Sequence, residues 1–438
     1  MKCALALGLA AFMCGCQLAV GPVGSWAVSA PPPTAISTNS MVALPDGRLV
    51  LFGGFDLRSG TPLDRTQVFD PAGNLWTVGA PMPGPLQPDV VVALRDGMVL
   101  VAGGVTFDPS GFSKPLGDTW LYDAGRNSWS KAGPMLTPRN GPGAVLLTDG
   151  TVLMAGGALQ VSQPDGTVSA KNVAGAEIFD PQTRRWSAAG NMNVPRDGAA
   201  LVALPHGSAV AAGGCAFNGG ISDAGNRFAV PLSDVELFDA TSRTWSITTS
   251  LSQTRCGAAG VLLSDGRVFV SGGGSGAVGN RGLTTLRSAV IFDPNSRQWT
   301  PAGTTIATRT SPVVLADGRV MIPDVEAGQS NGNTFTVLVG GQIYDPRSGD
   351  WNYVTTTSIA VSSRFFDQVG FGSALGAALP NGQAVVLVVV AALTFHPDIA
   401  PANAQPLDSP SLSMLLAALA LVLALLLGVL YMRGKRPG

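Results

Sequence analysis

Residues 144–157 read AVLLTDGTVLMAGG, and this stretch decides the fold. Two apolar runs flank Asp149-Gly150, a pair that favours a tight type I′ turn because both of its residues tolerate positive φ. We therefore expect a β-hairpin with strands at 144–147 and 152–155. Gly156-Gly157 follows at once and is expected to end the second strand, at a place where neighbouring backbones come close.

A second stretch, EIFDPQTRRW at residues 177–186, supplies the other half of the unit. It predicts a third strand at 177–179 and, after another tight connection, a fourth at 185–187. The four strands together make one antiparallel sheet. A sheet of this size cannot bury both of its faces alone, so neighbouring units must stack against it.

The hairpin turn recurs along the chain, which indicates a repeat architecture. The spacing between successive turns is shortest from 46 to 96, at 50 residues, and longest from 317 to 381, at 64 residues. The seven turns lie at Asp46-Gly47, Asp96-Gly97, Asp149-Gly150, His206-Gly207, Asp265-Gly266, Asp317-Gly318 and Asn381-Gly382.

A second landmark is an aromatic residue followed by Asp, with Trp six residues after that Asp. The tryptophans of these units are Trp76, Trp129, Trp186, Trp245, Trp299 and Trp351. The last unit instead ends at Phe395-His396, with His396 in place of the Asp and no Trp strand after it, while Trp26 stands alone ahead of the first unit. We therefore expect the N-terminal strand to complete the last unit and close the ring, which removes exposed sheet edges.

These landmarks, together with recurrent Gly-Gly pairs, resemble the kelch repeat family in the form also found in the galactose-oxidase-like propeller. The Gly-Gly pairs are Gly53-Gly54, Gly103-Gly104, Gly156-Gly157, Gly213-Gly214 and Gly272-Gly273. The resemblance covers residues 24–397 and implies an all-β fold, a seven-bladed β-propeller of four-stranded antiparallel blades. Blades six and seven depart from the pattern, because Pro323-Asp324 and Val388-Val389 lie where Gly-Gly is expected.

The N-terminus has the pattern of a secretory signal over residues 1–16. Lys2 precedes an apolar run at 4–13 that is too short to span a bilayer as a mature helix. Cys14-Gly15-Cys16 resembles a degenerate bacterial lipoprotein box, in which Cys16 would carry the lipid. The alternative is an ordinary signal peptide with incidental cysteines.

The C-terminus predicts a membrane anchor. A linker at 398–411 leads to an uncharged apolar run at 412–431, long enough for one transmembrane helix. The basic tail at 432–438 favours the cytoplasmic side, which places the propeller outside, in the cell envelope. The region also resembles bacterial C-terminal sorting signals, in which the helix is a transient anchor that is removed.

Composition argues against several functional classes. The 27 basic and 28 acidic residues give a net charge of −1, so there is no basic stripe of the kind that nucleic-acid binding needs. The only histidines, His206 and His396, both occupy repeat positions, which leaves none for a Ser-His-Asp relay or a His-rich zinc site. The Tyr, Cys and His ligands of galactose oxidase are not matched either. We expect no metal, no cofactor and no enzymatic activity.

Binding residues are expected on one face of the disc. Turns after the first and third strands of each blade are short and regular, and they lie on the face we call the turn face. Connections after the second strand lie on the opposite face, the loop face, and they are long and differ between blades, which is typical of binding loops on a rigid scaffold. The clearest examples are residues 105–117, 158–173, 215–233 and 275–286.

A recurrent arginine precedes the first strand of several blades. The matched positions are Arg139-Asn140, Arg196-Asp197 and Arg255-Cys256, with Arg309 two residues out of register. Arginines converging on the central channel would bind a carboxylate or a phosphate. The alternative, which we favour, is a structural role in which each arginine pairs with backbone carbonyls or a neighbouring Asp, because a residue that recurs with a scaffold belongs most simply to it.

Cys215 and Cys256 flank one blade on the same face and either form a disulfide outside the cytosol or are small buried residues.

The function we predict is a membrane-anchored, extracytoplasmic module that recognises a protein or a glycan through its loop face. The alternative is an extracytoplasmic carbohydrate-active enzyme, either sialidase-like with Tyr353 and the arginines or a two-carboxylate glycoside hydrolase. Two or more carboxylates at the channel mouth would favour the enzyme, and a broad, uncharged or aromatic loop surface would favour the binding module.

Overall fold

The computed structural model describes the chain from residue 24 to residue 397, with gaps. The gaps are 30–31, 34–35, 38–39, 57–60, 108–112, 163–167, 222–226, 277–282, 306–310, 332–333, 363–374, 380–382 and 389–390. The chain divides into two units, Met1–Ile399 and Ala400–Gly438, and all described residues belong to the first. Within these residues no helix is long and apolar enough to cross a membrane. The predicted signal peptide, linker, membrane segment and basic tail all lie outside the described residues.

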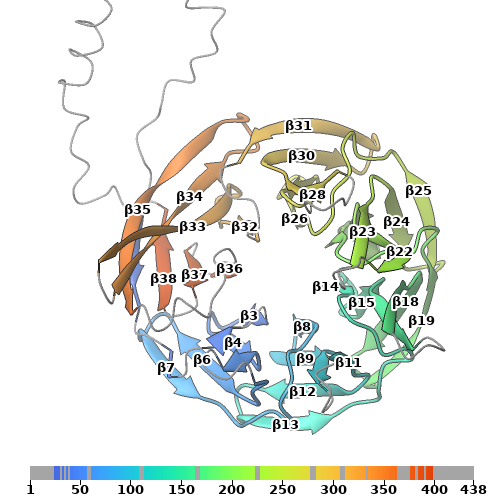
Figure 1. Ribbon diagram of the computed structural model, residues 1–438, viewed down its shortest axis with the longest axis horizontal. Helices are drawn as coiled ribbons and strands as arrows, with labels where there is room; N and C mark the ends of the chain where they lie inside the picture. The colour runs from blue at the N-terminus through green and yellow to red at the C-terminus, as the bar shows by residue number, and fades with distance from the viewer. Residues whose placement is uncertain are drawn as a thin grey trace, which may run out of the picture. The chain divides into compact units, whose positions relative to one another are not determined.

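The described residues form seven four-stranded antiparallel sheets, which follow one another around a ring (Figure 1). The first four blades, in chain order, are β3 (Met41–Ala43), β4 (Leu49–Phe52), β6 (Thr66–Asp70) and β7 (Leu75–Val78); β8 (Val90–Ala93), β9 (Met98–Ala102), β12 (Thr119–Asp123) and β13 (Ser128–Lys131); β14 (Gly143–Leu146), β15 (Val152–Ala155), β18 (Gly175–Asp180) and β19 (Arg185–Asn191); and β20 (Ala200–Ala203), β21 (Ser208–Ala212), β24 (Val235–Asp239) and β25 (Thr244–Thr248).

The remaining three blades complete the ring. They are β26 (Ala259–Leu262), β27 (Val268–Ser271), β30 (Ser288–Asp293) and β31 (Gln298–Thr304); β32 (Val313–Val314), β33 (Val320–Asn331), β34 (Thr334–Tyr344) and β35 (Trp351–Ser362); and β36 (Leu375–Ala378), β37 (Ala384–Val388), β38 (Ala391–His396) and β1 (Ser25–Val28). The predicted all-β propeller of four-stranded antiparallel blades is confirmed.

The N-terminal strand closes the ring, as the isolated Trp26 predicts. β1 pairs antiparallel with β38, so that Trp26 lies opposite Phe395 and Ser25 opposite His396. The innermost strands then contact one another in cyclic order: β3, β8, β14, β20, β26, β32, β36 and β3 again. Every blade therefore has a neighbour on each face, and the outermost strand of the last blade comes from the start of the chain.

The core lies between the blades and not at the centre of the ring. Middle strands present apolar side chains to both neighbours, and β4, β15 and β27 are buried along their whole length. Each aromatic–Trp pair adds a ring contact inside its blade, such as Phe179 and Trp186 with ring centroids 5.2 Å apart. The apolar core is thus divided into layers, which is why each blade depends on its neighbours.

Several repeat tryptophans also tie their blade to the preceding one, whereas the buried indole nitrogen of Trp245 has no hydrogen-bond partner among the described residues. The Trp129 indole donates to the backbone oxygen of Ala80 at 3.0 Å, and the Trp186 indole donates to the Thr119 hydroxyl at 2.9 Å. Trp299 and Trp351 make the same kind of bond to the preceding blade. These repeat tryptophans therefore fill space in the core and also donate a hydrogen bond between blades.

The hairpin predicted at Asp149-Gly150 is confirmed, but the predicted turn type, I′, is wrong. Gly150 has φ +90°, whereas Asp149 is not among the residues with positive φ. The Gly150 amide donates to Leu147 O at 3.0 Å, which makes a type I turn followed by a left-handed glycine. The Asp149 carboxylate accepts the Thr151 amide at 2.9 Å and so stabilises this three-residue loop.

Blades six and seven depart from the others where Gly-Gly is missing. In blade six, β33 continues through Pro323-Asp324 to Asn331, over 12 residues, and pairs with the 11-residue β34. In blade seven, β37 ends at Val388 and β38 begins at Ala391, and these two residues are paired. The glycine pairs in blades one to five have positive φ, which bends the chain out of the blade at this point.

Candidate functional site

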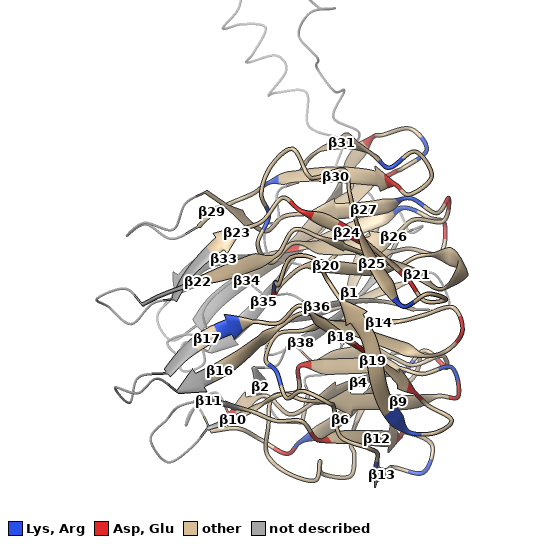
Figure 2. Ribbon diagram, turned by 90° about the vertical axis from the view of Figure 1, so that its right-hand side faces the viewer, with Lys and Arg blue, Asp and Glu red and all other residues tan. Residues whose placement is uncertain are grey.

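A two-stranded sheet follows the second strand in each of blades one to five. In blade one, β5 (Phe55–Asp56) pairs with β2 (Ile36–Ser37), which precedes the first strand of that blade. In blades two to five the connection itself forms both strands: β10 (Val105–Phe107) with β11 (Ser113–Pro115), β16 (Ala158–Ser162) with β17 (Val168–Asn172), β22 (Cys215–Ile221) with β23 (Arg227–Pro231), and β28 (Gly274–Ser275) with β29 (Thr284–Thr285). We call the last four pairs the hairpin tier. Figure 2 shows its labelled strands on one side of the disc, opposite the turns that carry most of the charged residues.

Neighbouring hairpins of the tier are fastened to one another. Asn172, at the end of β17, donates from its side-chain amide to Cys215 O at 3.2 Å. Its side-chain oxygen accepts the backbone amide of Phe217, so one side chain bridges the hairpins of blades three and four. Further round, the hydroxyl of Thr254, in the segment leading into blade five, lies 2.8 Å from the hydroxyl of Ser275 in the hairpin of that blade. The hairpins of blades three and four are therefore bonded to each other, and the hairpin of blade five is bonded to its own blade.

Cys215 and Cys256 form a disulfide, with Cα atoms 5.0 Å apart. Cys215 opens the hairpin of blade four, and Cys256 lies in the segment that leads into blade five. Cys256 is itself paired with Gly274 at the start of the next hairpin. The disulfide thus anchors the tier covalently across the boundary between these two blades.

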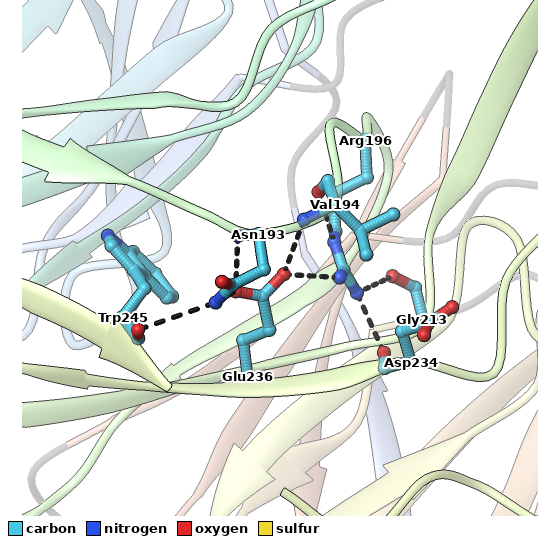
Figure 3. A network of polar contacts seen from close by, with 7 residues as sticks. All are labelled: Asn193, Val194, Arg196, Gly213, Asp234, Glu236 and Trp245. Carbon is cyan, nitrogen blue, oxygen red and sulfur yellow. Dashed lines mark hydrogen bonds and ion pairs between the residues drawn. The ribbon is translucent and has the colours of Figure 1, made fainter. Parts of the chain in front are cut away.

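Arg196 is 1% exposed and is held entirely inside blade four (Figure 3). Its Nη1 donates to Gly213 O at 2.9 Å and to Asp234 O at 2.7 Å, and its Nη2 donates to Glu236 Oε1 at 2.6 Å. Burial lowers the pKa of Arg196, and the carboxylate of Glu236 opposes that shift. This guanidinium group fastens the Gly-Gly bend to the third strand.

Glu236 completes the network from the other side. Its carboxylate accepts the backbone amides of Asn193 and Val194 at 2.7 and 3.0 Å, and these residues belong to the segment leading into blade four. Blade three repeats the arrangement with Arg139 and Glu177, each buried, and with two main-chain amides on the carboxylate. The predicted ligand-binding arginines Arg139 and Arg196 are thus committed to structural contacts.

The other residues proposed for ligand binding have different environments. Asn140 and Asp197 are half-buried, and their main chains pair with Ala158 and Cys215 at the base of the hairpins. Arg255 is 1% exposed inside blade five and contacts Gly272 O. Arg309 lies outside the described residues. The sequence prediction located the repeat position correctly, but the three described arginines do not converge on a shared cavity because each guanidinium turns into its own blade.

Asp89 is a residue that the sequence analysis missed. It lies in the segment leading into blade two, at the place occupied by Pro142, Ala199 and Ala258 in the next three blades. Burial raises its pKa to about 6, and backbone amides of Gly141 and Gly104 oppose the shift. A comparison of blades two to five could have found it, because the other three blades have an apolar residue at this position.

The two histidines and Tyr353 lie in three different blades. His206 is in the 3-10 turn η1 (Pro205–Gly207), and His396 pairs with Ser25 in the last blade. Tyr353, at 54% exposure, is on the outermost strand of blade six, away from the buried Arg139 and Arg196 of blades three and four. Within the part of the chain that the structure describes, no group of three or more His, Cys, Asp or Glu residues is placed to hold a metal ion.

Comparison with known proteins gives the same architecture. The Kelch motif family model matches residues 42–83 and 255–305, which fall in blades one and five. Kelch-like protein 25 of Xenopus tropicalis is 32% identical over 253 residues, covering 56% of this chain and 37% of that protein. The human protein of the same name is 30% identical over 249 residues, with the same coverage. The chain thus spans little more than a third of the length of these relatives.

Solved structures extend the likeness to most of the chain. A fungal alcohol oxidase of the AA5 family, solved in complex with copper, superimposes with a TM-score of 0.59 at 14% identity, covering 86% of this chain and 76% of that one. The structure of YjhT gives a TM-score of 0.51 at 16% identity, covering 75% of this chain and 99% of that one. Identities this low show the fold alone. The chain is therefore a β-propeller of four-stranded antiparallel blades, with matched Kelch motifs in blades one and five.

Proposed function

We propose that this propeller is a recognition module that binds a protein or a glycan through the hairpin tier on its loop face. The observation that carries the proposal is the tier itself. Four hairpins project from one face of a closed scaffold. Side-chain bonds join the hairpins of blades three and four, and a disulfide joins the hairpin of blade four to the segment leading into blade five. Such an arrangement preorganises a broad surface, which lowers the entropy lost when a partner binds.

The chemistry of the tier supports a partner that is recognised by shape and by uncharged contacts. Its exposed, described side chains include Val230, Thr284 and Thr285, with Lys171 as a charged exception. The turn face, by contrast, carries repeated ion pairs such as Arg48–Asp46 and Arg319–Asp317. Binding at the tier should therefore depend only weakly on salt concentration.

The proposal includes a location outside the cytoplasm, with the C-terminus in the membrane. The apolar run at 412–431 and the basic residues after it support an anchor of this orientation. The Cys215–Cys256 disulfide supports an oxidising compartment. Alkaline extraction and protease accessibility of the chain in intact cells test this part of the proposal.

The functional test is a parallel screen of binding and turnover with detergent-solubilised full-length chain. Glycan and surface-protein arrays measure binding, and glycoside hydrolysis assays on the same glycans measure turnover. Binding without turnover, and with little change between low and physiological salt, is the expected result. Turnover of a bound glycan would reject the recognition module in favour of the carbohydrate-active enzyme.

A further inference from the structure

Blade five keeps the repeat arginine but lacks the acid that accompanies it elsewhere. Glu177 and Glu236 each lie two residues before the strand-three aromatic of their blade. The matching residue in blade five is Val290, which pairs with Val270 as Glu236 pairs with Ala211. Arg255 is nevertheless 1% exposed, as deeply buried as Arg196.

Among the described residues, no carboxylate contacts Arg255. Its Nη1 donates to Gly272 O and Ser288 O at 2.8 and 2.9 Å, and its Nη2 donates to the Ser288 hydroxyl at 2.7 Å. Its Nε is buried and has no hydrogen-bond partner among the described residues. Burial lowers the pKa of Arg255 with no opposing contribution from an acid. A buried guanidinium group that lacks a counter-charge is costly, since desolvation is not repaid.

Blades three and four show what the missing carboxylate does. In each, one carboxylate accepts from the arginine Nη2 and from two successive main-chain amides, Leu136 and Thr137 in blade three. The corresponding residues before Arg255 are Ser252 and Gln253. They are exposed, and Val290 is only half-buried, whereas Glu236 is 0% exposed. Within the described residues, no ion pair or hydrogen bond joins a carboxylate to Arg255, and Val290 stands at the position that Glu236 has in blade four.

We propose that blade five binds a small monovalent anion, such as chloride or a short carboxylate, between the Arg255 guanidinium and the segment Ser252-Gln253. The anion takes the place that the Glu236 carboxylate has in blade four. It neutralises the buried charge through charge-assisted hydrogen bonds and holds the segment leading into blade five. Cys256, half of the disulfide, follows Arg255 directly, so the anion also stabilises the anchored edge of the hairpin tier.

The test compares thermal unfolding of the full-length chain in sodium chloride, sodium formate and sodium gluconate at equal ionic strength. Gluconate is too large to take the place of a side-chain carboxylate and serves as the reference. We expect Tm in chloride or formate to exceed Tm in gluconate by about 1–3 °C and to increase with the logarithm of anion concentration. Whichever of the two anions gives the larger shift identifies the preferred class.

Val290→Glu supplies the carboxylate internally, and Val290→Gln is its neutral control of matched size. The Glu variant is expected to lose the anion-dependent shift, and the Gln variant to keep it. Glu236→Val removes the carboxylate beside Arg196 in blade four, and we expect it to add a second anion-dependent increase in Tm. This variant keeps the proposal testable if the Val290 variants do not fold. The same Tm in all three salts for the unmodified chain, or a full shift in Val290→Glu, overturns the proposal.

Discussion

The indole of Trp26 donates to the backbone oxygen of Thr355 at 2.6 Å, across 329 residues of sequence. The Thr355 hydroxyl returns a bond to Gly24 O at 2.8 Å. These contacts join the N-terminal strand to blade six, while the same strand pairs with β38 in blade seven. The point where the ring closes is therefore built from the beginning of the folded chain, and it repeats the link that other tryptophans make between consecutive blades.

Replacing Trp26 by Phe should weaken closure of the ring. The variant keeps an aromatic ring but loses the indole N–H, and we expect the free energy of unfolding to fall by about 1 kcal/mol. Urea unfolding followed by tryptophan fluorescence measures the change. Trp299→Phe removes an equivalent bond inside the ring and is the matched control. A cost at Trp26 far below that at Trp299 would mean that the closure contact contributes little.

The Arg196–Glu236 pair should behave as a coupled buried unit. Removing either partner alone, in Arg196→Met or Glu236→Leu, leaves a buried charge and should cost about 3–5 kcal/mol. The double variant should cost clearly less than the sum of the two, because the charge is lost together with its partner. A double-mutant cycle from chemical denaturation gives the coupling energy. The exposed pair Arg267–Asp265 is the control and should contribute no more than about 1 kcal/mol. Additive costs at Arg196 and Glu236 would contradict the network.

Asp89 should make stability depend on pH between about 4 and 6. Its pKa is raised to about 6 in the folded protein, so the folded state holds a proton that the unfolded state releases above its ordinary value of about 4. The stabilising contribution is full below that lower value and is lost as pH rises through 6. The Asp89→Asn variant carries no charge at this position. Its free energy of unfolding, relative to that of the unmodified chain, should therefore rise as pH increases from about 4 to 6.

Denaturation of both proteins at pH 4, 5, 6 and 7 measures the effect. The difference in unfolding free energy should increase by about 2–3 kcal/mol, at roughly 1.4 kcal/mol per pKa unit, and should then stay level above pH 6. Asp234→Asn is a control, because Asp234 enters the Arg196 network through its backbone oxygen. A difference between Asp89→Asn and the unmodified chain that is flat from pH 4 to pH 7 would show that Asp89 is not perturbed.

The disulfide should stabilise the fold by constraining the unfolded chain. Cys215 and Cys256 are 41 residues apart, and a loop of this size corresponds to about 4 kcal/mol in the chain-entropy model. Cys215→Ser with Cys256→Ser should lower the free energy of unfolding by an amount of this order. A reductant should destabilise the unmodified chain similarly and should leave the double variant unchanged. A reductant effect of equal size on both proteins would exclude the disulfide as its cause.

The blades were predictable from sequence because their determinants are local and repeated. Asp149-Gly150 and the Phe179–Trp186 spacing each fix a tight turn, and the isolated Trp26 fixes how the ring closes. The turn type at Asp149 was not predictable from the dipeptide alone, because the carboxylate bonds to the Thr151 amide and favours a three-residue loop. Repetition also identified the arginine positions before their partners were known.

The site was harder to predict, because its contacts join segments far apart in the sequence. Glu236 looks like any strand residue, and only the fold brings it to Arg196, 40 residues away. Asn172 likewise bridges to Phe217 only because two hairpins lie side by side. The connections after the second strands were expected to be loops, since no periodic pattern marks the short strands within them.

The most direct test of the recognition module uses the ligand identified in the binding screen and three lysine variants. Val230→Lys and Thr284→Lys place a charge on the hairpin tier, and Ile247→Lys places the same charge on β25, where Ile247 is 56% exposed and Val230 is 43% exposed. Titration calorimetry on the full-length proteins should show at least a roughly tenfold loss of affinity, or about 1.4 kcal/mol, for the two tier variants and no loss for Ile247→Lys. Unchanged affinity in both tier variants, or a loss only in Ile247→Lys, would contradict binding through the loop face.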